Sequence, residues 1–218
     1  IASDPGTSTA PVPGTWGSDA RHVYSKQQPW NSDMTLITIE NRSGGSPSPL
    51  LLDGDTYRPV ATPCKGYARF DYRWHPSRAH SHEQINVTSD GLELMWFDVV
   101  ACVKTRTWTL PFAVDYGIGS GEGNPSRGGR FVALGDGTRV FVVDMDPQPP
   151  NAPYPAVRIG PVCTLPPCSL TVASPTTCPI GNISISPSGR YIDIKYSGAA
   201  DTVADMHRIL EVDSTTLA

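Results

Sequence analysis

The sequence has little charge and lacks long apolar runs. Asp, Glu, Lys and Arg make up 17% of its 218 residues, the net charge is −4, and basic residues do not gather into a stripe. Nucleic-acid binding therefore has no electrostatic support. No apolar run approaches the roughly 20 residues that a membrane-spanning helix needs. We therefore expect neither a nucleic-acid partner nor a membrane span. The chain starts on IASD without Met, as expected of a processed mature form or of a protein sequenced as isolated.

Helical periodicity is also scarce. Only residues 201–212, DTVADMHRILEV, could pass for a helix, and we interpret the latter part, 207–212, as a strand. The chain has 20 Gly and 22 Pro, about a fifth of its residues, where the usual share is roughly 12%. Residues that interrupt helices and form turns are thus abundant. This composition predicts an all-β fold of many short strands joined by many turns.

The cysteines lack the spacing of a zinc site, because they form no paired C-x-x-C units and have no neighbouring histidines. A disulfide that closes a Pro-rich loop is the better interpretation, either Cys168–Cys178 or Cys163–Cys178, and a second bridge can join Cys64 to Cys102. An odd number of cysteines leaves one thiol free.

Three Asn-x-Ser/Thr sequons, at Asn41, Asn86 and Asn182, are compatible with secretion. Disulfides form in oxidising compartments. Together the two features predict a secreted, extracellular protein.

The chain contains an internal repeat after an N-terminal arm. Residues 1–20 are rich in Ser, Thr, Pro and Gly and predict a flexible arm, and the repeated part covers 21–218. NPSRGGRFVAL (124–134) and SISPSGRYIDI (184–194) both place a polar turn with Gly-Arg before an alternating apolar run. Four units of two strands follow this pattern: 31–41 with 48–60, 88–100 with 104–112, 126–137 with 139–146, and 186–198 with 207–217.

The turns of the four units align on Met34, Gly91, Gly129 and Gly189, with the shortest step between the second and the third. Glycine is expected there because a short hairpin needs positive φ. A mean step of about 50 residues, with several strands per unit, is typical of radially repeated sheets, whose apolar faces are buried by stacking around an axis. We therefore predict a β-propeller of about four blades, either a closed four-bladed ring or part of a larger propeller that a second chain or a homo-oligomer completes. A β-sandwich and separate small domains are the alternatives.

The segment SPSGRYIDIKYSG (186–198) with HRILEVDSTT (207–216) resembles a blade of the secreted multi-bladed β-propellers, whose hairpins commonly carry Ser-Pro-Asp-Gly-Arg before a strand. Met34 and Gly128 depart from this pattern in the first and third units. The resemblance implies a fold rather than a function, because propellers include lyases, hydrolases, lectins and scaffolds.

The richest chemical segment is YRWHPSRAHSHEQINV, 72–87, with three of the five histidines. His80 and His82 are two residues apart, so on a strand both would face one side, as ligands of one metal do. The segment resembles oligogalacturonate lyases, a seven-bladed propeller family with closely spaced histidines and a glutamine around a divalent metal. The resemblance implies a divalent metal ion held by His80, His82 and Gln84, with His75 or Arg73 as the base or charge stabiliser. Solvated surface histidines are the alternative.

A Gly-rich segment, GIGSGEGNPSRGGR (117–130), predicts contact with a ligand. It offers Glu122, Asn124 and Arg127 among glycines that let a backbone approach a ligand closely. A plain flexible turn is the alternative.

An aromatic segment, SKQQPWNSD (25–33), predicts a sugar contact. Trp30 stands close to Gln27, Gln28 and Asn31, a combination that stacks on a sugar ring and binds its hydroxyls. The alternative is that Trp30 is buried between blades.

These features predict a secreted β-propeller that acts on or binds carbohydrate, most concretely a polysaccharide-lyase-like protein for acidic glycans. The alternative is a non-catalytic binding or self-assembly module built from propeller blades.

Overall fold

The computed structural model describes residues 4–22, 27–61, 72–118, 123–145, 159–165, 180–196 and 206–218. These residues form thirteen strands and one short 3₁₀ helix, η1 (Arg78–His80). The strands are β1 (Asp19–Arg21), β2 (Leu36–Arg42), β3 (Leu50–Asp53), β4 (Arg73–Trp74), β5 (Glu83–Val87), β6 (Glu93–Asp98), β7 (Val103–Thr109), β8 (Phe131–Gly135), β9 (Arg139–Asp144), β10 (Cys163–Thr164), β11 (Ile180–Ile185), β12 (Tyr191–Tyr196) and β13 (Met206–Glu211).

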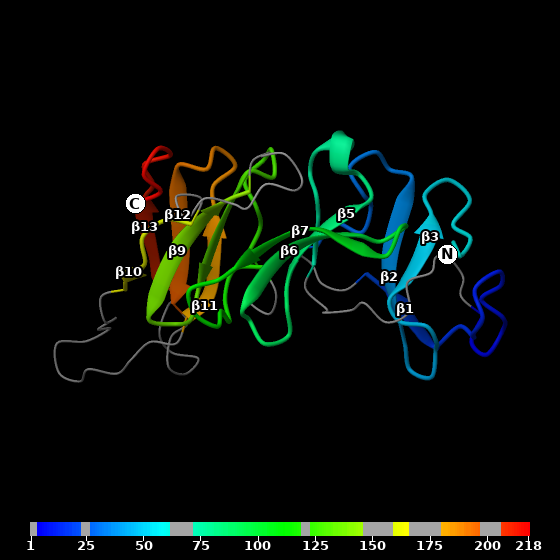
Figure 1. Ribbon diagram of the computed structural model, residues 1–218. Helices are drawn as coiled ribbons and strands as arrows, with labels where there is room; N and C mark the ends of the chain where they lie inside the picture. Colours follow the sequence, from blue (N-terminus) through cyan, green and yellow to red (C-terminus); the bar gives the residue numbers. More distant parts are fainter. Residues whose placement is uncertain are drawn as a thin grey trace, which may run out of the picture. The chain divides into compact units, whose positions relative to one another are not determined.

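The strands form four small antiparallel sheets, with strand orders β1-β2-β3, β4-β5-β6-β7, β10-β9-β8 and β11-β12-β13 (Figure 1). Each predicted two-strand unit becomes a pair of neighbouring strands, namely β2–β3, β6–β7, β8–β9 and β12–β13. The segment that could pass for a helix contains β13, so the strand interpretation is confirmed. The predicted fold class is confirmed, since the chain is all-β with four sheets of the kind that propeller blades have.

The four predicted turns share one geometry. Each has left-handed backbone at its fourth residue, at Met34 (φ 67°), Gly91 (74°), Gly129 (76°) and Gly189 (76°). The N–H of this residue donates to the carbonyl of the first residue at 2.8–3.1 Å. The side-chain oxygen of the first residue accepts the N–H five positions further on at 2.9–3.0 Å, and the first residues are Asn31, Thr88, Ser126 and Ser186. The internal repeat is therefore a repeat of hydrogen bonds as well as of sequence.

The chain divides into two compact units, Ile1–Asn86 with Met95–Arg106, and Val87–Leu94 with Thr107–Ala218. In the first unit β2 is buried on both faces. Leu36 belongs to a cluster with Tyr72 and Trp74, and Ile37 to a second cluster against which Trp30 packs. Leu36 and Ile37 thus anchor the start of β2 in two different apolar clusters.

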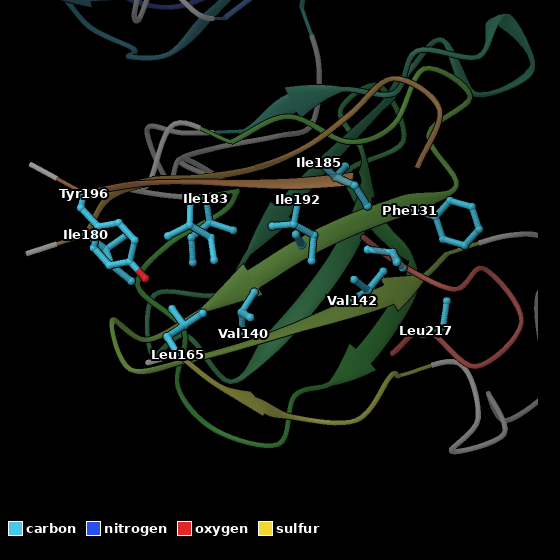
Figure 2. Close-up of a cluster of buried hydrophobic side chains, with 13 residues drawn as sticks. Phe131, Val140, Val142, Leu165, Ile180, Ile183, Ile185, Ile192, Tyr196 and Leu217 are labelled. Carbon is cyan, nitrogen blue, oxygen red and sulfur yellow. The ribbon is translucent and has the colours of Figure 1, made fainter. Parts of the chain in front are cut away.

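In the second unit, β11 and β12 cover β8 and β9 (Figure 2). Ile183, Ile194, Val140 and Val142 are at most 1% exposed and fill the space between the two sheets. Alternating side chains of each strand point into this core. The other faces of β8 and β9 are buried as well. The backbone of Gly117 lies close against β8, because a Cβ there would clash with the carbonyl of Ala133.

The described part of the predicted arm, 1–20, is hydrogen-bonded to the segment that follows β2. Residues 4–16 form a small loop in which Trp16 N–H donates to Thr7 O at 2.8 Å, and Thr15 forms a bridge with Ser46. The arm's end at residue 20 falls inside β1. Neither its flexibility nor the blade boundary at residue 21 is tested by these contacts, and both stay predictions.

The cysteine and sequon predictions fare differently. Cys163 is exposed and free, so the Cys163–Cys178 pairing is wrong. Cys64, Cys168 and Cys178 lie outside the described residues, and the other two pairings stay predictions. Asn41 and Asn86 are fully buried, which removes two of the three sequons as glycan acceptors in the folded protein. Within the described ranges, no helix has the length and apolar character to span a membrane.

Candidate functional site

A cavity of about 350 Å³ in the first unit brings together residues from two of the predicted segments. Its walls come from 28–34, which leads into β2, and from 74–76, which follows β4. The sequence predicts ligand-binding or catalytic roles for half of the lining residues, namely Gln28, Trp30, Asn31 and His75. The remaining lining residues are Ser32, Met34, Trp74 and Pro76.

The two walls are fixed to each other by side chains that donate to backbone carbonyls. These hydrogen bonds are Trp74 Nε1 to Pro29 O (2.9 Å), Asn31 Nδ2 to Ser81 O (3.1 Å) and Ser32 Oγ to Ser77 O (2.9 Å). Asn31 Oδ1 in turn accepts the N–H of Leu36. The amide of Asn31 and the hydroxyl of Ser32 are thus occupied by the scaffold, so the cavity is preformed rather than assembled by a ligand.

His75 is the buried polar group of this cavity, with an exposed fraction of 2%. Its ring packs edge-on against Trp96 at 4.5 Å between centroids and lies 4.6 Å from the ring of His80. Nδ1 accepts the backbone N–H of Ser77 at 3.1 Å, which assigns the proton of the neutral ring to Nε2. Nε2 is buried and has no hydrogen-bond partner among the described residues. His75, a residue of the cavity wall, therefore has a buried N–H group without a hydrogen-bond partner among the described residues.

The environment of His75 keeps its ring neutral. Burial is the largest cause that lowers its pKa, to about 3, and the nearby His80 and Arg106 lower it further. Both neighbours carry or can carry positive charge, which opposes a second cation. His75 is thus held in one tautomer, with its Nδ1 occupied as an acceptor.

The other predicted catalytic and metal-binding residues do not line the cavity. Arg73 is buried in β4, and its side chain donates to Tyr72 O at 3.0 Å. Gln84 is buried in β5 and its Nε2 donates to the hydroxyl of Thr38 at 3.2 Å. His80 Nδ1 lies 2.8 Å from the carboxylate of Glu83.

Gln27, predicted beside Trp30 as a sugar contact, is turned to the scaffold instead. It is 5% exposed, and its Nε2 donates to Tyr72 O at 2.5 Å. Gln27 therefore joins the start of the 28–34 wall to the residue that precedes β4, and the lining does not include it.

The strand geometry assumed for the predicted metal site is not found. His80 ends the 3₁₀ helix η1, and exposed His82 precedes β5, so the two histidines do not alternate along a strand. Ser77 caps the N-terminus of η1, where its hydroxyl accepts the N–H of Ala79. Across the described part of the chain, no three His, Cys, Asp or Glu side chains are grouped as metal ligands are. Assignment of His80, His82 and Gln84 to a metal stays a prediction without structural support.

The Gly-rich segment lies in the second unit. Asn124 and Arg127 are exposed, and backbone N–H groups of both donate to the turn region of β11 and β12, to Ser184 Oγ (3.4 Å) and Pro187 O (2.9 Å). A Cβ on Gly123 would clash with the carbonyl of Ile183. Glycine is therefore needed at 123 because the backbone contacts a neighbouring strand. The sequence alone does not show whether a glycine allows close approach of a strand or of a ligand. Glu122 lies outside the described residues.

Sequence reasoning misses the other half of the lining. Trp74 and Pro76 lie in the histidine segment without a role in the predicted site. Met34 carries a signal, because it stands where the other three turns have glycine. Ser32 contacts the opposite wall through a long-range hydrogen bond, for which the sequence has no local signal.

No family model and no curated protein matches the chain. Solved structures similar to it include the mitotic checkpoint complex (13% identity, 84% of this chain and 49% of that chain, TM-score 0.44) and the β-propeller domain of Cps50 (Swd1) from Myceliophteria thermophila (13%, 94% and 62%, 0.42). The C-terminal WD40 domain of Sif2 is a third (14%, 84% and 42%, 0.36). The chain thus spans less than two thirds of the length of each of these three structures. At these TM-scores the likeness assigns no function to the chain.

Proposed function

We propose that the chain is a non-catalytic binding module that holds an uncharged carbohydrate in the cavity formed by residues 28–34 and 74–76. One observation carries the proposal: a preformed cavity places an aromatic ring, Trp30, beside the exposed amide of Gln28 and the neutral ring of His75. Its volume of about 350 Å³ falls in the range of small-molecule sites, which is roughly 300–1,000 Å³.

The chemistry of the lining suits a sugar. Trp30 is half-buried and packs on the Ile37 cluster, so it is rigid and still accessible on the cavity side. An indole ring stacks on the C–H face of a sugar, and its neighbours satisfy the hydroxyls. The amide of Gln28 is exposed at the edge of the cavity and can both donate and accept. The neutral ring of His75 adds no charge to the wall.

The lining favours a neutral ligand over an acidic one. No residue of the lining carries a formal charge, because His75 is neutral at physiological pH. A uronic-acid carboxylate in this cavity would have no cationic partner there and would lose its hydration. We therefore prefer a neutral glycan to the acidic glycans predicted from the sequence.

The same lining favours binding over β-elimination. A lyase needs a group that removes a proton beside the carboxylate and a positive charge that stabilises the resulting anion. His75 Nδ1 is occupied by a backbone N–H, and Arg73 is not part of the lining. We retain an extracellular location, and ring completion by a second chain or copy, as parts of the proposal.

The test is to titrate the full chain with cellobiose, maltose, lactose and mannobiose and to measure binding by isothermal titration calorimetry and by NMR. We expect at least one neutral sugar to bind, Trp30→Ala to weaken it by at least about tenfold, and Gln28→Ala to weaken it less. Tyr191→Ala, which removes an exposed aromatic residue of β12, is the matched control and should leave affinity unchanged.

Two results would contradict the proposal. One is the absence of binding to every neutral sugar, and the other is wild-type affinity in a folded Trp30→Ala protein. Digalacturonate and polygalacturonate test the lyase alternative, through the ultraviolet absorbance of an unsaturated product. If that product forms, the chain is a lyase and the proposed non-catalytic role is wrong.

A further inference from the structure

Met34 breaks the pattern of the four repeated turns. Its backbone has φ 67°, in the left-handed region that side chains with a Cβ disfavour, and the equivalent residues Gly91, Gly129 and Gly189 are glycines. Glycine would satisfy the turn equally well, because the turn's hydrogen bonds come from the backbone and from the first residue's side chain. The turn itself therefore gives no reason for a methionine.

Packing gives no reason for it either. The side chain of Met34 is 63% exposed, more than any other large apolar side chain in the described part of the chain. Neither apolar cluster of the first unit includes it. What Met34 does contact is the cavity, of which it is a lining residue together with Trp30 and His75.

The backbone around Met34 is held firmly. A Cβ on Gly54 would clash with the carbonyl of Met34, so the end of β3 lies directly against this turn. Gly54 N–H donates to Thr35 O at 2.7 Å, and the carboxylate of Asp33 accepts the N–H and hydroxyl of Thr35 at 3.1 and 2.6 Å. The unfavourable backbone conformation is thus fixed by its surroundings, and this fixes the direction of the Cα–Cβ bond. Strain of this kind gathers at ligand sites.

We propose that Met34 is a specificity-determining contact of the cavity, whose thioether side chain covers an apolar C–H face of the bound sugar. This inference rests on the proposed function and deepens it. The flexible, polarisable methionine side chain adapts to a C–H surface without competing for hydroxyls. Trp30 and Met34 then select sugars with apolar faces, and the exposed amide of Gln28 binds the polar edge.

The test is Met34→Gly, because its effects on stability and binding are expected to have opposite signs. Glycine relieves the left-handed strain and adds some flexibility to the unfolded chain, so Tm should not fall and should rise by up to about 4 °C. Affinity for the neutral disaccharide that binds best should fall by about tenfold, which corresponds to the loss of roughly 50 Å² of apolar contact. Met34→Leu keeps an apolar side chain and should bind within about threefold of the wild type.

Ile209→Ala is the matched control, because Ile209 is also a highly exposed apolar residue, at 60%, but lies on β13 in the second unit. It should leave the affinity unchanged. Wild-type affinity in Met34→Gly, when the unmutated chain binds sugar and Trp30→Ala does not, would overturn the role of Met34 and leave the proposed function standing. An equal loss in Met34→Leu and Met34→Gly, or a lower Tm in Met34→Gly, would also overturn it. Lack of sugar binding by the unmutated chain would end both.

Discussion

Acidification should destabilise the protein through His75 specifically. Its folded-state pKa is lowered from 6.5 to about 3, mainly by burial and further by His80 and Arg106. In an unfolded chain the imidazole would titrate near its ordinary value, so between these two pH values the unfolded state binds a proton that the folded state excludes. The stabilising contribution is complete above pH 6.5 and is lost as the pH falls toward the folded-state value.

The size of the effect follows from the shift. Each pH unit inside the window is worth about 1.4 kcal/mol for one group, so acidification from pH 6.5 to roughly pH 4 should remove about 3 kcal/mol of unfolding free energy. His80, which is paired with Glu83, and Arg106 are the charged or titratable groups that face the ring. Both are basic, so neither favours the protonated form of His75.

Urea denaturation followed by tryptophan fluorescence, at several pH values, measures this contribution. His75→Asn retains an amide oxygen near the position of Nδ1 for the Ser77 N–H, but has no group that titrates. We expect the mutant to be less stable than the wild type at neutral pH and the difference to shrink by about 3 kcal/mol near pH 4. His82→Asn, at an exposed position, is the control and should follow the wild type. Parallel loss of stability in the wild type and His75→Asn would refute the reasoning.

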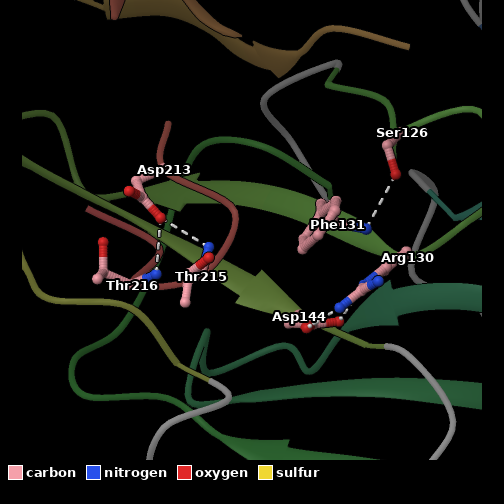
Figure 3. A network of polar contacts seen from close by, with 7 residues as sticks. All are labelled: Ser126, Arg130, Phe131, Asp144, Asp213, Thr215 and Thr216. Carbon is pink, nitrogen blue, oxygen red and sulfur yellow. Dashed lines mark hydrogen bonds and ion pairs between the residues drawn. The ribbon is translucent and has the colours of Figure 1, made fainter. Parts of the chain in front are cut away.

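Two further predictions concern the second unit. A Cβ on Gly189 would clash with the ring of Phe131, and the backbone φ there is 76°, so Gly189→Ala should lower the free energy of unfolding by about 2 kcal/mol or more. Gly128 has open space around it, so Gly128→Ala is the control and should change that free energy by less than about 0.5 kcal/mol. Equal urea midpoints for the two variants would contradict this prediction. Asp144 is 3% exposed and accepts two hydrogen bonds from Arg130, at 3.1 and 3.0 Å (Figure 3). Asp144→Ala should therefore lower the free energy of unfolding by about 2 kcal/mol, measured in the same way. A change below about 0.5 kcal/mol would show that the pair does not stabilise the fold.

The strands and turns can be predicted from sequence because their signals are local. A positive-φ glycine, a Ser or Thr three positions before it and an alternating apolar run all lie close together along the chain, as around Gly91 and Gly189. Even Met34 is placed correctly by alignment with these turns. Each such signal acts through backbone geometry, which a single sequence displays directly.

The site can be predicted only in part, because its contacts are long-range. Residue type alone identifies Trp30, Gln28 and His75, but nothing local shows that segments 28–34 and 74–76 face one cavity. The metal prediction assumes a strand through His80 and His82, whereas the Ser77 cap starts a 3₁₀ helix there. Burial decides the role of His75, and that burial depends on Trp96, which lies on a different strand.

The four turns keep one geometry although the steps from one turn to the next are unequal. Each turn makes its two defining hydrogen bonds within a hexapeptide, from the N–H groups of the fourth and sixth residues to the first residue. Grafting the hexapeptide of one turn into another should preserve the local fold, which makes these four corners natural places at which to exchange recognition loops.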